Sequence, residues 1–198
     1  ESNGSTGILI EMNTPGGMLD ATRRIVSSFI ASDVPIITYV SPSGARAGSA
    51  GTFLVAASHI AVMAPTTNIG AASPVSSDGS DLDKMLASKA SQDTAALMRS
   101  IAEARGRNVT ALEATVLKAK AYSSEEALES GIIDYIAEGR DQLLALLDGE
   151  IVVTKSRTVT ISTTAITLSE GKRNWKEKFL DAVGDPNITF ILLTIGSI

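Results

Sequence analysis

The stretch Gly44-Ala45-Arg46-Ala47-Gly48-Ser49-Ala50-Gly51-Thr52-Phe53 places one serine among small residues, directly before an apolar segment. Glycine and alanine around Ser49 leave room for another backbone to approach its hydroxyl group. The run Ala50–Ser58 predicts a short buried helix that begins at or near Ser49, where unpaired N–H groups favour negative charge. The same pattern is typical of an ordinary strand-to-helix connection, so Ser49 is a candidate nucleophile that needs support from other residues.

Composition narrows the classes of function. The chain has 198 residues, 44% of them hydrophobic, which suits one main domain with a sizeable core. The net charge of -5 and the lack of a basic patch argue against a nucleic-acid partner. The absence of cysteine excludes disulfides, thiolate nucleophiles and zinc sites of the cysteine type. The single histidine, His59, lies in an apolar run and is interpreted as structural, with a catalytic imidazole as the alternative.

Short apolar runs alternate with amphipathic segments, which indicates an α/β architecture. Strands are expected at Gly7–Met12, Val34–Val40, His59–Met63 and Ile132–Ala137. Helices are expected at Met18–Ala31, Ala50–Ser58, Asp81–Ala104, Asn108–Lys118, Ser124–Ser130 and Arg140–Leu147. Asn108 or Thr110 can cap the fourth of these helices, and Ser123 with Glu126 forms a capping box for the fifth.

The first expected strand ends in the turn Asn13-Thr14-Pro15-Gly16-Gly17. Two consecutive glycines can direct their N–H groups toward one point, an arrangement suited to an anionic oxygen. If Ser49 is a nucleophile, the N–H of Gly16 or Gly17 together with that of Ala50 would form an oxyanion hole. An extended substrate could add a strand beside Gly16–Gly17 or beside the segment from Asn68 to Ser73.

A serine nucleophile needs a base, for which the choices are His59, carboxylates and lysines. On the expected helix 81–104, helical spacing predicts an apolar stripe that contains Lys89 and places Lys84 on the far side. The stripe residues are Leu82, Met85, Leu86, Ala96 and Leu97. Lys89 can snorkel with its ammonium group at the rim of the stripe. Alternatively, it can be a lysine withdrawn from water that serves as general base.

After the main domain, residues 1–148, the composition changes. Residues 149–170 alternate threonine with branched residues and predict a small β appendage. Residues 171–187 form a basic amphipathic segment that fits a helix lying at a membrane surface, or a docked surface helix. Residues 188–198 are uncharged and are interpreted as the start of a truncated membrane helix or as a buried strand.

Four motifs resemble the Clp/crotonase-fold serine proteases, and among these the membrane-bound NfeD family, whose founding relatives are stomatin-partner proteases. They occur in the family's order and are Asn13–Gly17, Gly44–Thr52, Met63–Ala71 and Ala102–Asn108. The resemblance implies a spiral of ββα units, Ser49 as nucleophile and Lys89 as base, with no cofactor. Clp peptidases carry a histidine where this chain has Asn68-Ile69-Gly70-Ala71, so their Ser-His-Asp triad cannot be carried over.

The resemblance also implies a substrate, partners and a location. The substrate would be a hydrophobic peptide segment of a membrane protein, bound at Asn68, Ile69, Gly70, Ala71 and Ala72. A stomatin-like protein would be the partner, and the protease would form a homodimer or a higher oligomer. The full-length protein would be anchored in the membrane with its protease domain outside the cytoplasm. The first strand and helix of the family, expected before Gly7, are missing from this sequence.

Three other interpretations fit the same residues. A catalytically silent oligomeric scaffold would bind a membrane partner without turnover. Acyl-CoA chemistry of the crotonase type shares the architecture, although no catalytic carboxylate stands in a recognisable site. A signal-peptide-peptidase-like protease also uses a Ser-Lys pair, and repetition of the domain would distinguish it.

Overall fold

A computed structural model describes residues 7–74 and 84–163 of the chain. These residues belong to one compact unit, Glu1–Thr164. The loop expected at 75–80, the cap at Asp81, Leu82 in the apolar stripe, and the segments 171–187 and 188–198 all lie outside the described residues. Among the described helices, none is both long and apolar enough to cross a bilayer.

A parallel sheet of four strands forms the centre of this unit, in the order β1-β2-β4-β7. Its strands are β1 (Ile8–Met12), β2 (Ile36–Val40), β4 (Ile60–Met63) and β7 (Tyr135–Ile136). Every residue of β2 and β4 is buried, as expected for a parallel sheet covered on both faces. The four expected strands are therefore confirmed, although β7 is shorter than the predicted run.

A second sheet has the order β3-β5-β6 and was not expected from the sequence. Its strands are β3 (Arg46–Gly48), β5 (Asn68–Gly70) and β6 (Ala121–Ser123). β3 pairs in parallel with β5, and β5 pairs antiparallel with β6. An isolated bridge between Thr14 and Ala47 brings the turn after β1 to the free side of β3. Strands of three residues are too short to show a periodic pattern, so pairing alone defines them.

The described helices are close to those expected. They are α1 (Leu19–Ile30), α2 (Ala50–Ala57), α3 (Lys84–Arg105), α4 (Val109–Leu117), α5 (Ser124–Glu129) and α6 (Arg140–Leu147). Of the two candidate caps for α4, Asn108 is the one used, and its side chain accepts the Ala111 N–H at 3.0 Å. The capping box of Ser123 and Glu126 is present at the start of α5.

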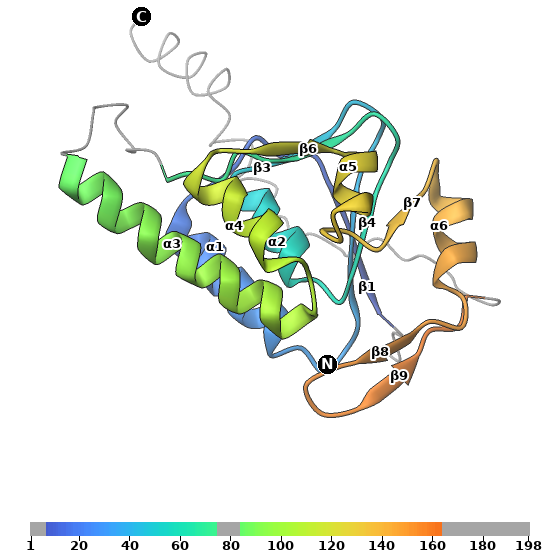
Figure 1. Cartoon of the computed structure of the whole chain (residues 1–198). Coiled ribbons are helices and arrows are strands. Elements are labelled where there is room, and N and C mark those ends of the chain that lie inside the picture. Colours follow the sequence, from blue (N-terminus) through green and yellow to red (C-terminus); the bar gives the residue numbers. More distant parts are fainter. Residues whose placement is uncertain (1–6, 75–83, 164–198) are drawn as a thin grey trace, which may run out of the picture. The chain divides into compact units, whose positions relative to one another are not determined.

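The two faces of the parallel sheet bury two separate hydrophobic clusters. Residues alternate between the faces of a strand, so Val40 and Met63 pack with helices α1 to α4, and Tyr39 and Val62 pack with α6. In Figure 1 the helices α1, α2, α3 and α4 accordingly lie on one side of the sheet, opposite α6. The order strand, strand, helix occurs twice in succession, first as β2, β3 and α2 and then as β4, β5 and α3.

The threonine-rich region after Gly149 contains a hairpin of β8 (Ile151–Val153) and β9 (Thr158–Thr160). Val152 and Ile161 are buried in the same cluster as Leu143 of α6. The hairpin thus contributes apolar side chains to the core behind the parallel sheet.

Gly70 offers a test of how closely β5 packs against the segment before β6. Gly70 has a φ of +130°, and a Cβ built there would lie 2.3 Å from the backbone oxygen of Lys120. Gly149 has a φ of +83° with no atom within 4 Å of such a Cβ. We expect Gly149→Ala to cost about 1 kcal/mol for backbone strain alone, and Gly70→Ala at least about 3 kcal/mol. Urea unfolding of both variants measures the difference, and equal losses would contradict this packing.

Candidate active site

Ser49 occupies the N-cap position of α2 in a strained backbone conformation. Its φ is 49° and its ψ is -113°, a region that residues with a Cβ rarely adopt. The Ser49 N–H donates to the carbonyl oxygen of Gly70 at 3.0 Å, which holds this conformation from β5. A serine at an N-cap usually accepts a hydrogen bond from its own helix, but the Ser49 side chain does not cap α2. Among the described residues, the Ser49 hydroxyl group forms no hydrogen bond.

Thr52, in the first turn of α2, connects this turn to the second sheet by hydrogen bonds. Its buried hydroxyl group lies 3.0 Å from the Ala47 carbonyl oxygen and 3.1 Å from that of Gly70, and can donate to either. The same oxygen accepts the Gly70 N–H at 3.1 Å. The sequence interpretation missed this residue, because a threonine inside an apolar helix resembles any other core residue.

The Gly16-Gly17 turn passes directly against Ser49. A Cβ added to Gly16 would lie 2.9 Å from the Ser49 Cβ and 3.4 Å from its Oγ, and Gly16 has a φ of +146°. Only glycine fits this position, because both the space and the backbone conformation exclude a side chain. The structure thus contains the close backbone approach to the Ser49 hydroxyl group that the small residues predicted.

Two of the three predicted oxyanion donors have no hydrogen-bond acceptor among the described residues. The Gly16 N–H donates to the Thr14 hydroxyl group at 3.2 Å, so it is already engaged. Within residues 7–74 and 84–163, the N–H groups of Gly17 and Ala50 donate to no other group. A Cβ on Gly17 would lie 3.6 Å from that of Ala50, so the two donors come from neighbouring segments. Among the described residues, Gly17 and Ala50 are therefore the predicted donors whose N–H groups have no partner.

The segment from Asn68 to Ala72 begins with β5, which has no open edge. β5 is paired on one side with β3 and on the other with β6, so a substrate strand cannot pair with Asn68–Gly70. Ile69 and Ala72 are buried, and the Ala71 N–H donates to the Lys120 carbonyl oxygen at 3.0 Å. The expectation that a substrate adds a strand beside this segment is wrong for β5, because the second sheet already occupies both of its sides.

Lys89 does not lie in the buried stripe of α3. The side chain of Lys89 is exposed, as are Met85 and Leu86, at 66% and 57%. The buried residues of this helix are Thr94, Ala95, Met98, Ile101 and Ala102. Lys89 and Met98 are separated by two and a half helical turns and therefore point in opposite directions. The predicted inward orientation is wrong, because the apolar residues near the start of α3 are not the ones that pack on the core.

Other contacts place Lys89 on a definite side of α3. Asp93, one turn after Lys89, forms an ion pair with Arg23 of α1. Residues four apart lie on the same helix face, so Lys89 shares the face that meets α1. Helix α1 begins at Leu19, directly after Gly17 and Met18. Lys89 therefore lies one helical turn before the residue of α3 that pairs with α1.

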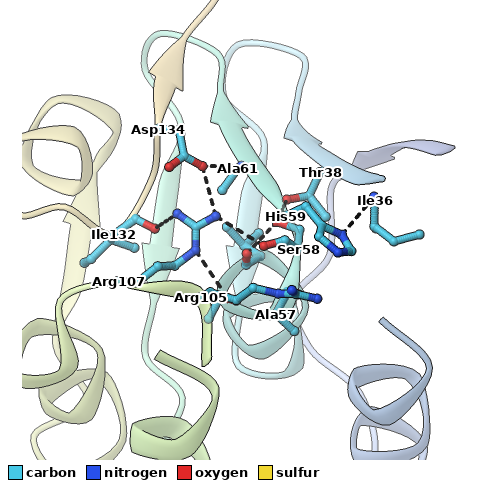
Figure 2. A network of polar contacts seen from close by, with 12 residues as sticks. Ile36, Thr38, Ala57, Ser58, His59, Ala61, Arg105, Arg107, Ile132 and Asp134 are labelled. Atoms are coloured by element: carbon cyan, nitrogen blue, oxygen red, sulfur yellow. Dashed lines mark hydrogen bonds and ion pairs between the residues drawn. The ribbon is translucent and has the colours of Figure 1, made fainter. Parts of the chain in front are cut away.

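His59 lies at the other end of α2 and has a structural role, as predicted. Its Nδ1 accepts the Ile36 N–H at 3.0 Å, a bond visible in Figure 2. The eight residues of α2 span about 12 Å. This helix separates His59 from Ser49, so the imidazole does not serve as its base. Burial, and second the nearby charge of Arg105, lower the pKa of His59 from 6.5 to about 4, so the ring is neutral at pH 7.

Two arginines hold the C-terminal end of α2, as Figure 2 shows. Arg105 donates to the Ala57 carbonyl oxygen at 2.8 Å and to that of Phe29 at 3.0 Å. Arg107 donates to the backbone oxygens of Ala56, Ser58 and Ile132 at 3.2, 3.3 and 3.0 Å. Arg107 also forms an ion pair of 2.9 Å with Asp134. The sequence contained these residues in the motif Ala102–Asn108 but did not indicate what they contact.

Comparison with known proteins identifies relatives of this chain. A family model described as "NfeD1b, N-terminal domain" matches residues 1–152. Membrane-bound protease PH1510 of Pyrococcus horikoshii is 35% identical over 201 residues, which cover 99% of this chain and 45% of the relative. The chain thus spans about half the length of this curated relative.

Solved structures with the same fold include variants of the 1510-N membrane-bound stomatin-specific protease. A lysine-to-alanine variant in complex with a substrate peptide has a TM-score of 0.82 and 33% identity, and the match covers 93% of this chain and 85% of that one. A serine-to-alanine variant has a TM-score of 0.77 and 34% identity, with 86% and 85% covered. The mixed α/β architecture is therefore shared with these proteases.

The strain at Ser49 predicts a difference between two substitutions. Glycine adopts the observed dihedral angles freely, whereas alanine keeps the strain of a residue with a Cβ. We expect the free energy of unfolding of the Ser49→Gly variant to be about 1–2 kcal/mol higher than that of the Ser49→Ala variant. Both variants lack the hydroxyl group, so urea denaturation isolates the backbone contribution. A Ser49→Ala variant as stable as Ser49→Gly would show that the conformation costs nothing.

His59 predicts a loss of stability on mild acidification. Between pH 6.5 and about 4 the unfolded chain binds a proton at His59 and the folded chain does not. Unfolding therefore becomes easier as the pH falls through this window, by about 1–2 kcal/mol after allowance for partial exposure of the ring to solvent. Between pH 7 and pH 4, the free energy of unfolding should fall by about 1–2 kcal/mol less in a His59→Gln variant than in the unmodified chain. Denaturant titrations at both pH values measure this, and identical losses would contradict the depressed pKa.

Proposed function

The chain belongs to the family of NfeD1b N-terminal domains, and from this we propose that it is a serine endopeptidase with Ser49 as nucleophile and Lys89 as general base. One observation carries the proposal. The Ser49 hydroxyl group lies unbonded at the start of α2, in a strained turn, beside the unoccupied N–H groups of Gly17 and Ala50. Strained serines between a strand and a helix are typical of nucleophiles, and free N–H groups beside them stabilise an oxyanion.

The proposed reaction uses these groups in sequence. The Ser49 Oγ attacks the carbonyl carbon of a peptide bond as its proton passes to the neutral amine of Lys89. The N–H groups of Gly17 and Ala50 bind the oxygen that becomes negative. Lys89 then protonates the leaving amine as the C–N bond breaks, and water hydrolyses the acyl-enzyme.

The assignment of Lys89 rests on spacing and on its place on α3. In the related protease, the serine and the lysine replaced in the two solved variants are 41 positions apart. Ser49 and Lys89 are 40 positions apart, whereas Lys84 is 35 positions from Ser49. Met85 and Leu86 lie four and three residues before Lys89, so all three share one exposed side of the helix. An apolar substrate or a second copy that covers Met85 and Leu86 would withdraw Lys89 from water.

The proposed substrate is an extended, hydrophobic peptide segment of a stomatin-like membrane protein. Relatives named as stomatin-specific proteases support this choice. Because β5 is paired on both sides, the substrate strand would lie beside Gly16–Gly17, next to the exposed Met18. A hollow of about 560 Å³ opens beside Asn13 at the C-terminal ends of β1 and β2. Asn13 and Gly16 are three positions apart, at most about 10 Å of chain, so neighbouring substrate residues can reach this hollow.

The remaining parts of the proposal concern architecture and assembly. The repeated order strand, strand, helix supports a Clp/crotonase-like spiral of ββα units for residues 1–148. The β appendage at 149–170, the interfacial segment 171–187 and the membrane-helix start 188–198 remain proposals. So do a homodimer or higher oligomer, and a membrane anchor with the protease domain outside the cytoplasm. The name of the curated relative as a membrane-bound protease supports the anchor.

The dyad predicts that two substitutions each remove activity. We expect Ser49→Ala and Lys89→Ala to reduce cleavage of an apolar peptide at least about 1,000-fold, because each removes a group that reacts. Peptide cleavage is followed by mass spectrometry, with circular dichroism to confirm that both variants remain folded. Lys84→Ala is the matched control from the same helix and should retain activity.

Two outcomes would contradict this function. Substantial cleavage by a folded Ser49→Ala or Lys89→Ala variant would exclude the dyad. An unmodified chain that binds the peptide but never cleaves it would instead favour the catalytically silent scaffold, for which the exposed position of Lys89 in this single chain is the supporting observation.

A further inference from the structure

We propose that Arg107 is a positioning residue for Ser49, which it controls from the opposite end of α2. The inference rests on the proposed role of Ser49 as nucleophile. Arg107 lies in the turn between α3 and α4, directly after Gly106. It does not touch the reacting atoms, and it acts through the helix whose first position carries the nucleophile.

The C-terminal end of α2 requires donors that water cannot supply. The last carbonyl groups of a helix have no partners within the helix, and here Ala56, Ala57 and Ser58 are completely buried. Arg107 and Arg105 supply these donors, as Figure 2 shows. Their positive charges also complement the negative end of the helix dipole.

Arg107 connects this end of α2 to the central sheet. The residue is 7% exposed, and its guanidinium group bonds Ala56, Ser58, Ile132 and Asp134 together. The Asp134 carboxylate in turn accepts the Ala61 N–H of β4 at 2.7 Å. A guanidinium group can bond several acceptors in different directions, which the ammonium group of a lysine cannot reproduce. The C-terminal end of α2 therefore has a fixed position relative to β4.

The N-terminal end of α2 is then fixed by the length of a rigid helix. The two oxyanion donors come from different segments, because Gly17 belongs to the turn after β1 and Ala50 to α2. A shift of α2 along its axis would move Ser49 and Ala50 together while Gly17 stays in place. Displacements of about 1 Å in an active site can reduce the rate about 100-fold. A substrate strand bound beside Gly16–Gly17 would be held as before, so we expect the rate constant kcat to fall and KM to remain.

The test compares Arg107→Met and Arg107→Lys in the full chain, with an apolar peptide as substrate. We expect kcat to fall about 100-fold in Arg107→Met and about 10-fold in Arg107→Lys, with KM within about twofold of the unmodified value. Amide hydrogen exchange, read by mass spectrometry, should become faster across residues 49–57. Should Arg107→Met fail to fold, Arg107→Lys carries the same test.

Leu143→Ala is the matched control. Leu143 is fully buried in the second hydrophobic cluster, whereas Ala56, Ala57 and Ile132 belong to the first. Its truncation lowers global stability, as the loss of a buried arginine does, and urea titration measures both losses. At a temperature where all variants are folded, Leu143→Ala should keep its kcat and its exchange rate across residues 49–57. A purely structural role for Arg107 would instead give equal effects at equal loss of stability.

The outcomes separate this inference from the proposed function. An active unmodified chain whose Arg107 variants retain kcat within about twofold would overturn the positioning role. An inactive unmodified chain would overturn the proposed function, and hydrogen exchange would still decide on Arg107. In that case, faster exchange across residues 49–57 than in Leu143→Ala supports the positioning role, and equal exchange overturns it.

Discussion

The turn after β1 packs against the first residues of α2 at backbone distance, and the geometry around Ser49 depends on this contact. Added Cβ atoms on Gly16, Gly48 and Gly51 would lie 2.9 Å from Ser49, 3.0 Å from the Pro15 oxygen and 2.8 Å from the Thr14 side chain. The lack of a side chain at these three glycines therefore allows the turn after β1 to pack directly against the start of α2. This contact brings the N–H groups of Gly17 and Ala50, which are far apart in sequence, to the same serine. A side chain at any of the three glycines would separate them.

The two ends of α2 differ in how their polar groups are used. At the C-terminal end, the carbonyl oxygens of Ala56, Ala57 and Ser58 are bonded by arginine side chains. At the N-terminal end, the Ala50 N–H and the Ser49 hydroxyl group are left without partners among the described residues. The helix dipole makes the open end favourable for negative charge. A helix held firmly at one end and unsatisfied at the other suits the stabilisation of charge that develops during acyl transfer.

The fold was predictable where neighbouring residues decide it. The capping box of Ser123 and Glu126 and the Asn108 cap each involve residues within four positions, so their patterns identify them. The strands of the parallel sheet were predictable because both of their faces are buried, which requires continuous apolar runs. The strands β3, β5 and β6 were not, because they contain three residues each and exist only through pairing with one another.

The candidate site divides in the same way. The close approach of a glycine to Ser49 and the short helix after the serine were predictable from the sequence, because small residues and an apolar run are properties of consecutive positions. The tertiary structure alone decided that the Gly16 N–H is engaged by Thr14, that β5 has no free edge and that Arg107 holds α2. It also reversed the orientation of Lys89. Helical spacing identifies which residues share a face, but only the packing of α3 against its neighbours decides which face is covered.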